Sequence, residues 1–498
     1  MKNLKSNIIS NYVGRSWSAI LALILVPIYI RYVGIEAYGL IGFFTSLLAV
    51  VGILDLGLGN TINRELAISS ASSKNKYTQR DLVRTFEIIY WIIAVVAGII
   101  IMFGASFISN NWLNSENIDS ETLIFSIQMM AIAVTFRFPM SLYQGGLMGL
   151  QKQVLTNKIL VFVGTLRGLG AIFVLEFISS TIGTFFIWQA IISLFSSLIF
   201  ALTLWYNLPE SNRRSKFNKD ILVSIWRYTA AISANAIVGL LISQIDKILL
   251  SKLLSLEKFG YYIIATTVAS VIWLIIVPIG QAIFPKFAEL YKSNKNELIP
   301  LFHKSCQILA LILIPVCSIL VFFSKEIILI WMGDPLIAQN TYIIVSLLVL
   351  GTFLNGLSSI TSYAGSAFGW PEGMLYINVA QSIIITPLLI FLVFRLDSLG
   401  AAIAWVIINS TYIFIYVPMF FKKFLITEKR KWFLNDTLYP LVIGFSTCAL
   451  IKFLTPNIDN IFLLTGWIIL TGLITLITTG ISLTIIRTFF NDSFLKQQ

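Results

Sequence analysis

The stretch Ile88–Phe107 reads IIYWIIAVVAGIIIMFGASF and carries no charged side chain. A helix of about 20 apolar residues spans the hydrocarbon core of a bilayer. Leu301–Phe323 is a second long apolar stretch of this kind, and others occur along the whole chain. Of the 498 residues, 57% are hydrophobic and 12% are charged, whereas a soluble domain is about 25% charged. The sequence therefore predicts an all-α integral membrane protein.

Charged or turn-rich breaks divide the chain into about fourteen expected transmembrane helices. Their approximate bounds are 10–30, 39–59, 87–108, 122–147, 159–178, 184–206, 229–251, 261–284, 305–324, 340–368, 374–394, 399–421, 437–454 and 461–486. The first span contains Arg15 and ends at Pro27–Arg31 without a small-residue cleavage site, so we interpret it as a retained span rather than a signal peptide.

The distribution of Lys and Arg sets the expected orientation, because these residues accumulate in cytoplasmic loops. With the N-terminus inside, roughly twenty-four of them fall in inside segments and about six in outside loops. We therefore expect both termini in the cytoplasm. The net charge of +12 is then a topology signal, and nucleic acid is not expected as a partner. The basic clusters 213–219 and 422–431 could alternatively bind anionic lipids.

Three short sequence patterns in the first half of the chain recur in the second half, and the number of residues between the two copies is nearly constant. Glu36-Ala37-Tyr38-Gly39 recurs as Glu257-Lys258-Phe259-Gly260, Tyr143/Gly145/Gly149 recurs as Tyr363/Gly365/Gly369, and Ile182/Gly183/Trp188 recurs as Leu399/Gly400/Trp405. Their common order and similar offsets indicate an internal repeat. Each repeat holds six spans, an even number, so both halves start inside and run in the same direction.

The repeat predicts two six-helix bundles, residues 1–208 and 209–425, related by a pseudo-two-fold axis along the membrane normal. Residues 426–498 would add two further transmembrane helices and a cytoplasmic tail. Two similar bundles can rock about a central cleft, which is what alternating access by a secondary transporter requires.

Several other activities leave no sign in the sequence. The phosphate-binding pattern GxxxxGK[ST] is absent, and no expected loop exceeds about thirty residues. The three cysteines and the single histidine, His303, lack the spacing of a metal site or a disulfide framework. We expect no catalytic residues, no metal and no cofactor.

Ionisable residues inside a span cost at least about 2.5–3.5 kcal/mol at the bilayer centre, so each needs a partner or a wet cavity. The two deepest are Arg137, in the fourth expected span, and Arg167, in the fifth, and both are cations. An arginine-lined cleft suits an anionic substrate, because a guanidinium can bind phosphate oxygens with two hydrogen bonds. The alternative is an arginine bonded to backbone carbonyls at a broken helix.

The remaining charges lie nearer the membrane faces. We assign Arg15 and Lys247 to the cationic substrate site, and Asp55, Asp246 and Glu176 to coupling or ion pairing. Arg15 and Asp55 could instead pair with each other. Asp246 and Lys247 are neighbours, point about 100° apart on a helix, and are not expected to face one spot.

The chain resembles a known family in two places. Asn11–Ala67 carries the stretch from Pro27 to Gly39, the LDLGLG run around Asp55, and Arg64-Glu65, while Gln244–Tyr262 reads QIDKILLSKLLSLEKFGYY. Both stretches are similar to those of the Wzx-type O-antigen and polysaccharide flippases of the multidrug/oligosaccharidyl-lipid/polysaccharide exporter superfamily. The resemblance spreads over the first twelve spans.

This resemblance implies a flippase that moves an oligosaccharide on undecaprenyl pyrophosphate from the inner to the outer leaflet of the bacterial cytoplasmic membrane. The implied partners are this lipid-linked substrate, membrane lipids, a polysaccharide polymerase and a chain-length regulator. Two alternatives stay open. A cation-coupled drug or metabolite exporter of the same superfamily would use a deep carboxylate, and an O-antigen polymerase or ligase would need an exposed outer site.

Overall fold

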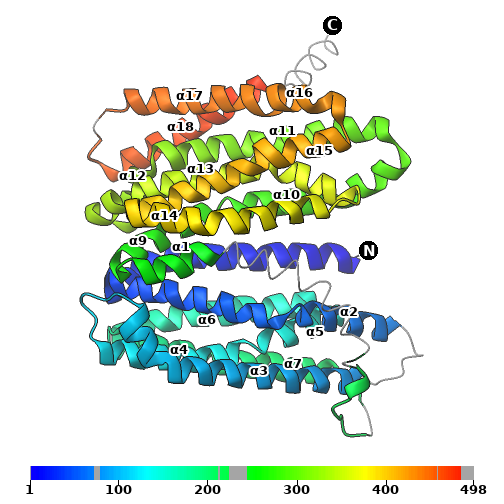
Figure 1. Cartoon of the computed structure of the whole chain (residues 1–498), viewed down its shortest axis with the longest axis vertical. Coiled ribbons are helices and arrows are strands. Elements are labelled where there is room, and N and C mark those ends of the chain that lie inside the picture. The colour runs from blue at the N-terminus through cyan, green and yellow to red at the C-terminus, as the bar shows by residue number, and fades with distance from the viewer. Residues whose placement is uncertain are drawn as a thin grey trace. The chain divides into compact units, whose positions relative to one another are not determined.

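The structure, a computed structural model, describes residues 2–71, 79–210, 213–221, 223, 244–456 and 458–483. The chain forms two compact units, Met1–Gly260 and Tyr261–Gln498, and helices account for the secondary structure that Figure 1 labels. The predicted boundaries at 208/209 and 425/426 stay predictions.

The first unit is a bundle of helices packed side by side (Figure 1). α1 packs on α6, α2 on α5, α3 on α4, and α7 on α4, α5 and α6. Their bounds are α1 Lys2–Gly52, α2 Leu58–Ala71, α3 Gln79–Phe107, α4 Ser120–Arg137, α5 Met140–Gly149, α6 Gln153–Phe177 and α7 Ile182–Asn207, with short helical turns at Ile53–Asp55 and Ile108–Trp112.

In the second unit, α13 packs on α10, α11 and α14, and α17 and α18 pack on each other and on α11. The helices are α9 Leu256–Ser270, which begins in the first unit, α10 Trp273–Ser293, α11 Lys295–Phe322, α12 Ser324–Met332, α13 Pro335–Ala367, α14 Glu372–Thr411, α15 Val417–Lys423, α16 Lys429–Lys431, α17 Tyr439–Leu454 and α18 Ile461–Ser482. Short turns lie at Tyr412–Tyr416, Ile426–Glu428 and Trp432–Leu438.

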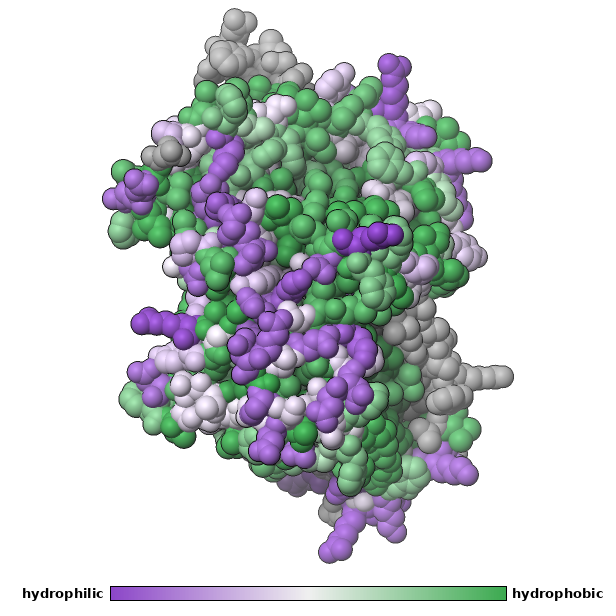
Figure 2. Space-filling model, turned by 60° about the vertical axis from the view of Figure 1, so that its left-hand side comes forward, coloured by the Kyte–Doolittle hydropathy of each residue, from purple (hydrophilic) through white to green (hydrophobic). Residues whose placement is uncertain are grey.

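Within the described residues, eleven helices are long and apolar enough to cross a membrane. Large apolar side chains such as Phe103 and Phe453 are more than four-fifths exposed, which suits lipid rather than water. Figure 2 shows hydrophobic side chains along the helix flanks and hydrophilic ones gathered over the ends turned toward the viewer. The chain is therefore a multi-pass membrane protein, as predicted.

Two of the eleven helical segments are long enough for a pair of expected spans. Trp17–Asp55 is kinked at Gly34, where φ is +82°, and Glu372–Lys423 is kinked at Asp397, where φ is +52°. Both kinks fall where the sequence predicts an outer loop. The count of fourteen stays a prediction, because most of the expected span 229–251 lies outside the described residues.

Helix ends differ from the hydropathy-based bounds in several places. The expected span 39–59 is interrupted after Gly52, and the expected span 122–147 is interrupted at Phe138–Pro139, between α4 and α5. Hydropathy cannot show such breaks, because the residues around them stay apolar. Conversely, α10 and α11 fill most of the expected loop 285–304, since helices continue beyond the apolar core.

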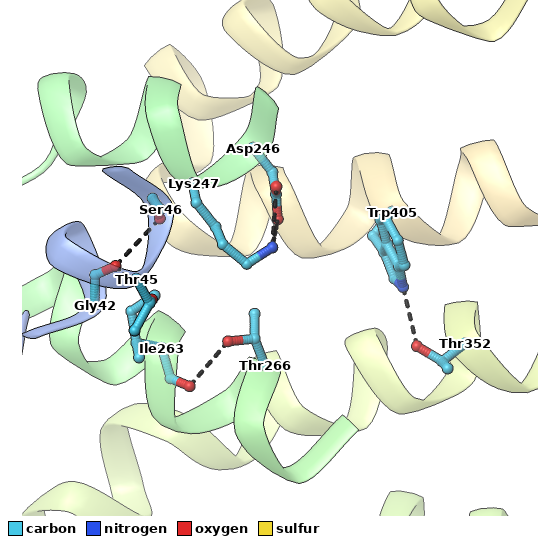
Figure 3. Close-up of polar contacts among 9 residues, drawn as sticks. All are labelled: Gly42, Thr45, Ser46, Asp246, Lys247, Ile263, Thr266, Thr352 and Trp405. Atoms are coloured by element: carbon cyan, nitrogen blue, oxygen red, sulfur yellow. Dashed lines mark hydrogen bonds and ion pairs between the residues drawn. The ribbon is translucent and has the colours of Figure 1, made fainter. Parts of the chain in front are cut away.

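The repeated tryptophans have similar surroundings in their own units. In the first unit, a Cβ on Gly170 would lie 2.2 Å from the Trp188 ring, and the Trp188 indole donates to the backbone oxygen of Arg167. In the second unit, a Cβ on Gly351 would lie 2.6 Å from the Trp405 ring, and the Trp405 indole donates to Thr352 (Figure 3). Each tryptophan thus packs on a glycine of a neighbouring helix, but these helices, α6 and α13, are the fifth and tenth expected spans and do not correspond under the predicted repeat.

Candidate functional site

A cavity of about 880 Å³ lies inside the first unit. Its walls come from α1, α2, α4, α5, α6 and α7, together with the turn at Asp55. Aromatic side chains contribute to one part of the wall, where Tyr29 and Phe185 pack edge to face with ring centroids 5.3 Å apart. Three charged residues line the cavity among those described: Asp55, Arg137 and Arg167.

Arg137 is the last residue of α4 and precedes the break at Phe138–Pro139. Proline cannot donate a backbone hydrogen bond, which favours a helix end at this point. The structure gives the Arg137 guanidinium no hydrogen-bond partner among the described residues, backbone carbonyls included. Its five N–H donors are therefore available to the cavity, and the broken-helix alternative, in which carbonyls hold the side chain, is not the arrangement observed.

Arg167 lines the same cavity from the middle of α6. One terminal nitrogen donates to the Ser196 hydroxyl at 3.4 Å, a long bond, and the Nε atom is buried without a partner in the described part of the chain. Buried N–H groups are usually bonded. Two incompletely bonded guanidinium groups thus meet at one cavity, which gives this region a net attraction for an anion.

Asp55 lies at the interruption between α1 and α2, where Leu56 and Gly57 have φ angles of +45° and +70°. Its carboxylate accepts hydrogen bonds from the Tyr90 hydroxyl and, at 3.2 Å, from the Ser141 hydroxyl. These bonds hold the carboxylate at the cavity wall, and none of the described ion pairs involves it. The proposed pairing with Arg15 is not tested, because the Arg15 side chain lies outside the described residues.

Asp246 and Lys247 correct one sequence expectation. Their side chains form an ion pair with a nitrogen–oxygen distance of 3.2 Å (Figure 3). The expectation was wrong because helical direction fixes only the Cβ atom, and the flexible lysine chain can bend toward a neighbour. Neither residue lines the cavity. Glu176 also lies away from it and accepts a hydrogen bond from the Tyr32 hydroxyl.

Sequence reasoning missed a buried acid, Glu87 on α3. Its carboxylate accepts from the Tyr143 hydroxyl at 2.9 Å and the Trp205 indole at 3.1 Å, and pairs with Arg84 at 2.8 Å. Its position at the first residue of the expected span 87–108 was the available signal. The three partners satisfy it, so Glu87 is a structural group.

A second missed cluster surrounds His303 on α11 in the second unit. Its two ring nitrogens contact Asp436 and, at 2.9 Å, Glu428, and Gln307 donates to the other oxygen of Asp436 at 2.7 Å. Carboxylates accept hydrogen bonds, so a ring nitrogen of His303 that carries a hydrogen can donate to the carboxylate it contacts. This cluster ties α11 to the segment that precedes α17.

The chain is similar to known proteins in sequence and in fold. A family profile described as "Polysaccharide biosynthesis protein" matches residues 4–291, more than half of the chain. The chain is also similar to the Shigella flexneri protein named "Putative O-antigen transporter", with 23% identity over 405 residues, which cover 80% of this chain and 93% of the relative.

Solved structures show the same fold at low identity. An inward closed structure of the lipid II flippase MurJ has a TM-score of 0.73 at 16% identity, covering 98% of this chain and all of that one. An inward-facing multidrug resistance transporter of the MATE family, MOP superfamily, has a TM-score of 0.66 at 16% identity, covering 83% of this chain and 96% of that one.

Proposed function

Since the chain belongs to the polysaccharide biosynthesis protein family, we propose that it is a flippase for lipid-linked oligosaccharides. The substrate is an O-antigen or related repeat unit on undecaprenyl pyrophosphate, moved from the inner to the outer leaflet of the bacterial cytoplasmic membrane by alternating access. Similarity to a protein named as an O-antigen transporter and a fold shared with a lipid II flippase support this proposal.

The observation that carries the proposal is the cavity shared by Arg137 and Arg167. Neither guanidinium has an acidic partner among the described residues. A pyrophosphate supplies the anionic oxygens that two arginines can bind. A charge-assisted hydrogen bond contributes about 1.5–3 kcal/mol, which holds a substrate in transit without preventing its release.

The polyprenyl tail stays in the lipid while the headgroup crosses. Exposing apolar carbons to water costs about 0.8 kcal/mol per CH₂, so only the pyrophosphate and the sugars need a polar path. The exposed apolar flanks of the helices are compatible with a tail that remains outside.

The same cavity bears on the competing candidates. A cation-coupled drug exporter would rely on a carboxylate, and Asp55 does line the cavity. That carboxylate is bonded to Tyr90 and Ser141 and is outnumbered by two cations, so the charge favours an anionic cargo. We assign no catalytic role to any residue, because the chain's relatives are named as transporters and flippases.

The proposal keeps the architecture expected from the sequence. The proposed architecture has fourteen spans, with six-helix bundles at 1–208 and 209–425 and two added helices in 426–498. Both termini lie in the cytoplasm. A polysaccharide polymerase and a chain-length regulator would receive the exported repeat unit.

A rescue experiment tests this function. The gene is expressed in bacteria deleted for their own O-antigen flippase, and surface polysaccharide is measured by gel analysis and antibody staining. Restored surface polysaccharide is the expected result. Normal membrane insertion without any restoration, in strains that supply several different repeat units, would contradict the proposal.

A further inference from the structure

Helices α2 and α5 touch through their backbones beside the cavity. A Cβ on Gly145 would lie 2.4 Å from the Gly59 backbone oxygen, and one on Gly149 would lie 2.5 Å from the Asn63 backbone oxygen. Such distances leave no room for a side chain, so glycine is required at both points. Small residues spaced four apart allow this close approach between membrane helices.

We call this close contact between α2 and α5 the seam. Both helices carry carboxamide side chains next to it. Asn60 follows Gly59, Gln144 precedes Gly145, and Asn63 lies one turn beyond Asn60 on α2. All three side chains line the cavity that Arg137 and Arg167 also line. We call these three residues the carboxamide cluster.

The carboxamide cluster has no hydrogen-bond partner within the part of the chain that the structure describes. The structure shows no hydrogen bond from Asn60, Asn63 or Gln144 to any described residue. A fourth carboxamide, Gln189, lines the cavity from α7, is 5% exposed, and likewise lacks a partner within the described ranges. Asn60 is exposed, and Asn63 and Gln144 are half-buried. Their amide groups are therefore open to the cavity, and this wall is suited to a bound polar ligand.

The chemistry of the cluster matches sugar hydroxyl and acetamido groups. A carboxamide offers two donors and a two-lone-pair acceptor, and a hydroxyl group likewise both donates and accepts. A phosphate only accepts, so half of each carboxamide's capacity would stay unused. Asp55 is anionic when ionised and lies next to the seam, with an oxygen 3.5 Å from the Cβ position of Gly59. Asp55 therefore disfavours an acidic sugar next to Gly59, although the two arginines give the cavity as a whole an attraction for anions.

We propose that the carboxamide cluster is a recognition site for uncharged sugar residues of the cargo, distinct from the arginines that bind the pyrophosphate. This proposal rests on the proposed flippase function and adds to it a surface that recognises the sugars of the cargo. Sites built to hydrogen-bond a hydroxyl discriminate strongly against ligands that lack it, so this surface would select among repeat units.

Binding measurements separate the two sites. Purified protein in nanodiscs is titrated with undecaprenyl pyrophosphate and with the lipid-linked oligosaccharide extracted from the flippase-deleted strain used for rescue. Asn60→Leu, Asn63→Leu and Gln144→Leu are made singly and together. Because these side chains bond nothing described in the protein, their replacement leaves no orphaned partner. Asn340→Leu, at an exposed position on α13 away from the cavity, is the matched control.

Each single substitution is expected to weaken binding of the glycosylated lipid by about 2- to 10-fold, and the triple variant by tenfold or more. Binding of sugar-free undecaprenyl pyrophosphate should stay at the wild-type level. If the triple variant binds both lipids as the wild type does, or loses both equally, the carboxamide proposal is wrong while the flippase function stands. If the wild type binds neither lipid, the flippase function itself fails.

Discussion

Gly145 on α5 lies directly against the backbone of Gly59 on α2, with only 2.4 Å between the Cβ position of the first and the carbonyl oxygen of the second. The two glycines lie in different expected spans, 39–59 and 122–147. Their contact fixes the wall that carries Asp55, Ser141 and the carboxamide cluster.

Gly145→Ala should therefore disturb the site through the fold. The added methyl group must push the helices apart, at a cost of about 1–3 kcal/mol. The expected result is a lower thermal unfolding temperature in detergent and reduced rescue of surface polysaccharide. Gly52→Ala is the matched control, because a Cβ at Gly52 meets nothing within 4 Å. Equal unfolding temperatures for the two variants would contradict the close contact.

His303→Leu should destabilise the second unit. The substitution leaves the buried Asp436 carboxylate with Gln307 but without its contact to the His303 ring. Removing a hydrogen-bond partner from a buried acceptor costs about 1–3 kcal/mol, and more when the acceptor is charged. We expect a clear fall in the unfolding temperature measured by scanning fluorimetry in detergent.

The exposed pair Lys286–Glu289 supplies the comparison for that experiment. Its side chains are 50% and 61% exposed, and such pairs contribute about 0–1 kcal/mol. Lys286→Leu should leave the unfolding temperature nearly unchanged. A His303→Leu protein as stable as Lys286→Leu would show that the His303 cluster does not hold α11 to the segment before α17.

The orientation of the last two helices can be tested with reporter fusions. The Lys and Arg distribution predicts that residue 430 is cytoplasmic and residue 457 is outside. A reporter active only in the cytoplasm should work when fused after residue 430 and fail after residue 457. The reverse pattern would mean that the span count is wrong by one.

The positions of charged residues within the expected spans predict the two arginines that line the cavity. Arg137 and Arg167 are the deepest charges in their spans, and the high cost of a membrane-embedded charge made them candidates without any structure. The sequence also predicts a membrane protein with a helical fold, because the hydropathy of the chain is sufficient for both predictions.

Contacts between distant helices could not be predicted in this way. The hydrogen bonds from Tyr90 and Ser141 to Asp55 join segments 35 and 86 residues away, and no local pattern encodes them. Pro139 is present at the break between α4 and α5, but hydropathy alone does not divide the expected span 122–147 at this residue. The Asp246–Lys247 pair was mispredicted because side-chain length was ignored.

Arg137→Ala and Arg167→Ala should each abolish the rescue of surface polysaccharide while the protein remains in the membrane. The physical reason is the loss of donors that face the cavity unpaired or nearly so, at about 1.5–3 kcal/mol for each charge-assisted bond. Rescue and membrane levels are measured in the same cells. Arg395→Ala, at an exposed position outside the cavity, is expected to export normally.

The lysine variants separate charge from geometry. Lysine keeps the positive charge but loses the planar fork that binds two phosphate oxygens at once, so Arg137→Lys and Arg167→Lys should retain partial export. Since Arg137 bonds nothing among the described residues, its removal orphans no partner, and a collapse of protein level would point to a structural role instead. Normal export by both alanine variants at wild-type levels would contradict a cationic cavity that binds the pyrophosphate.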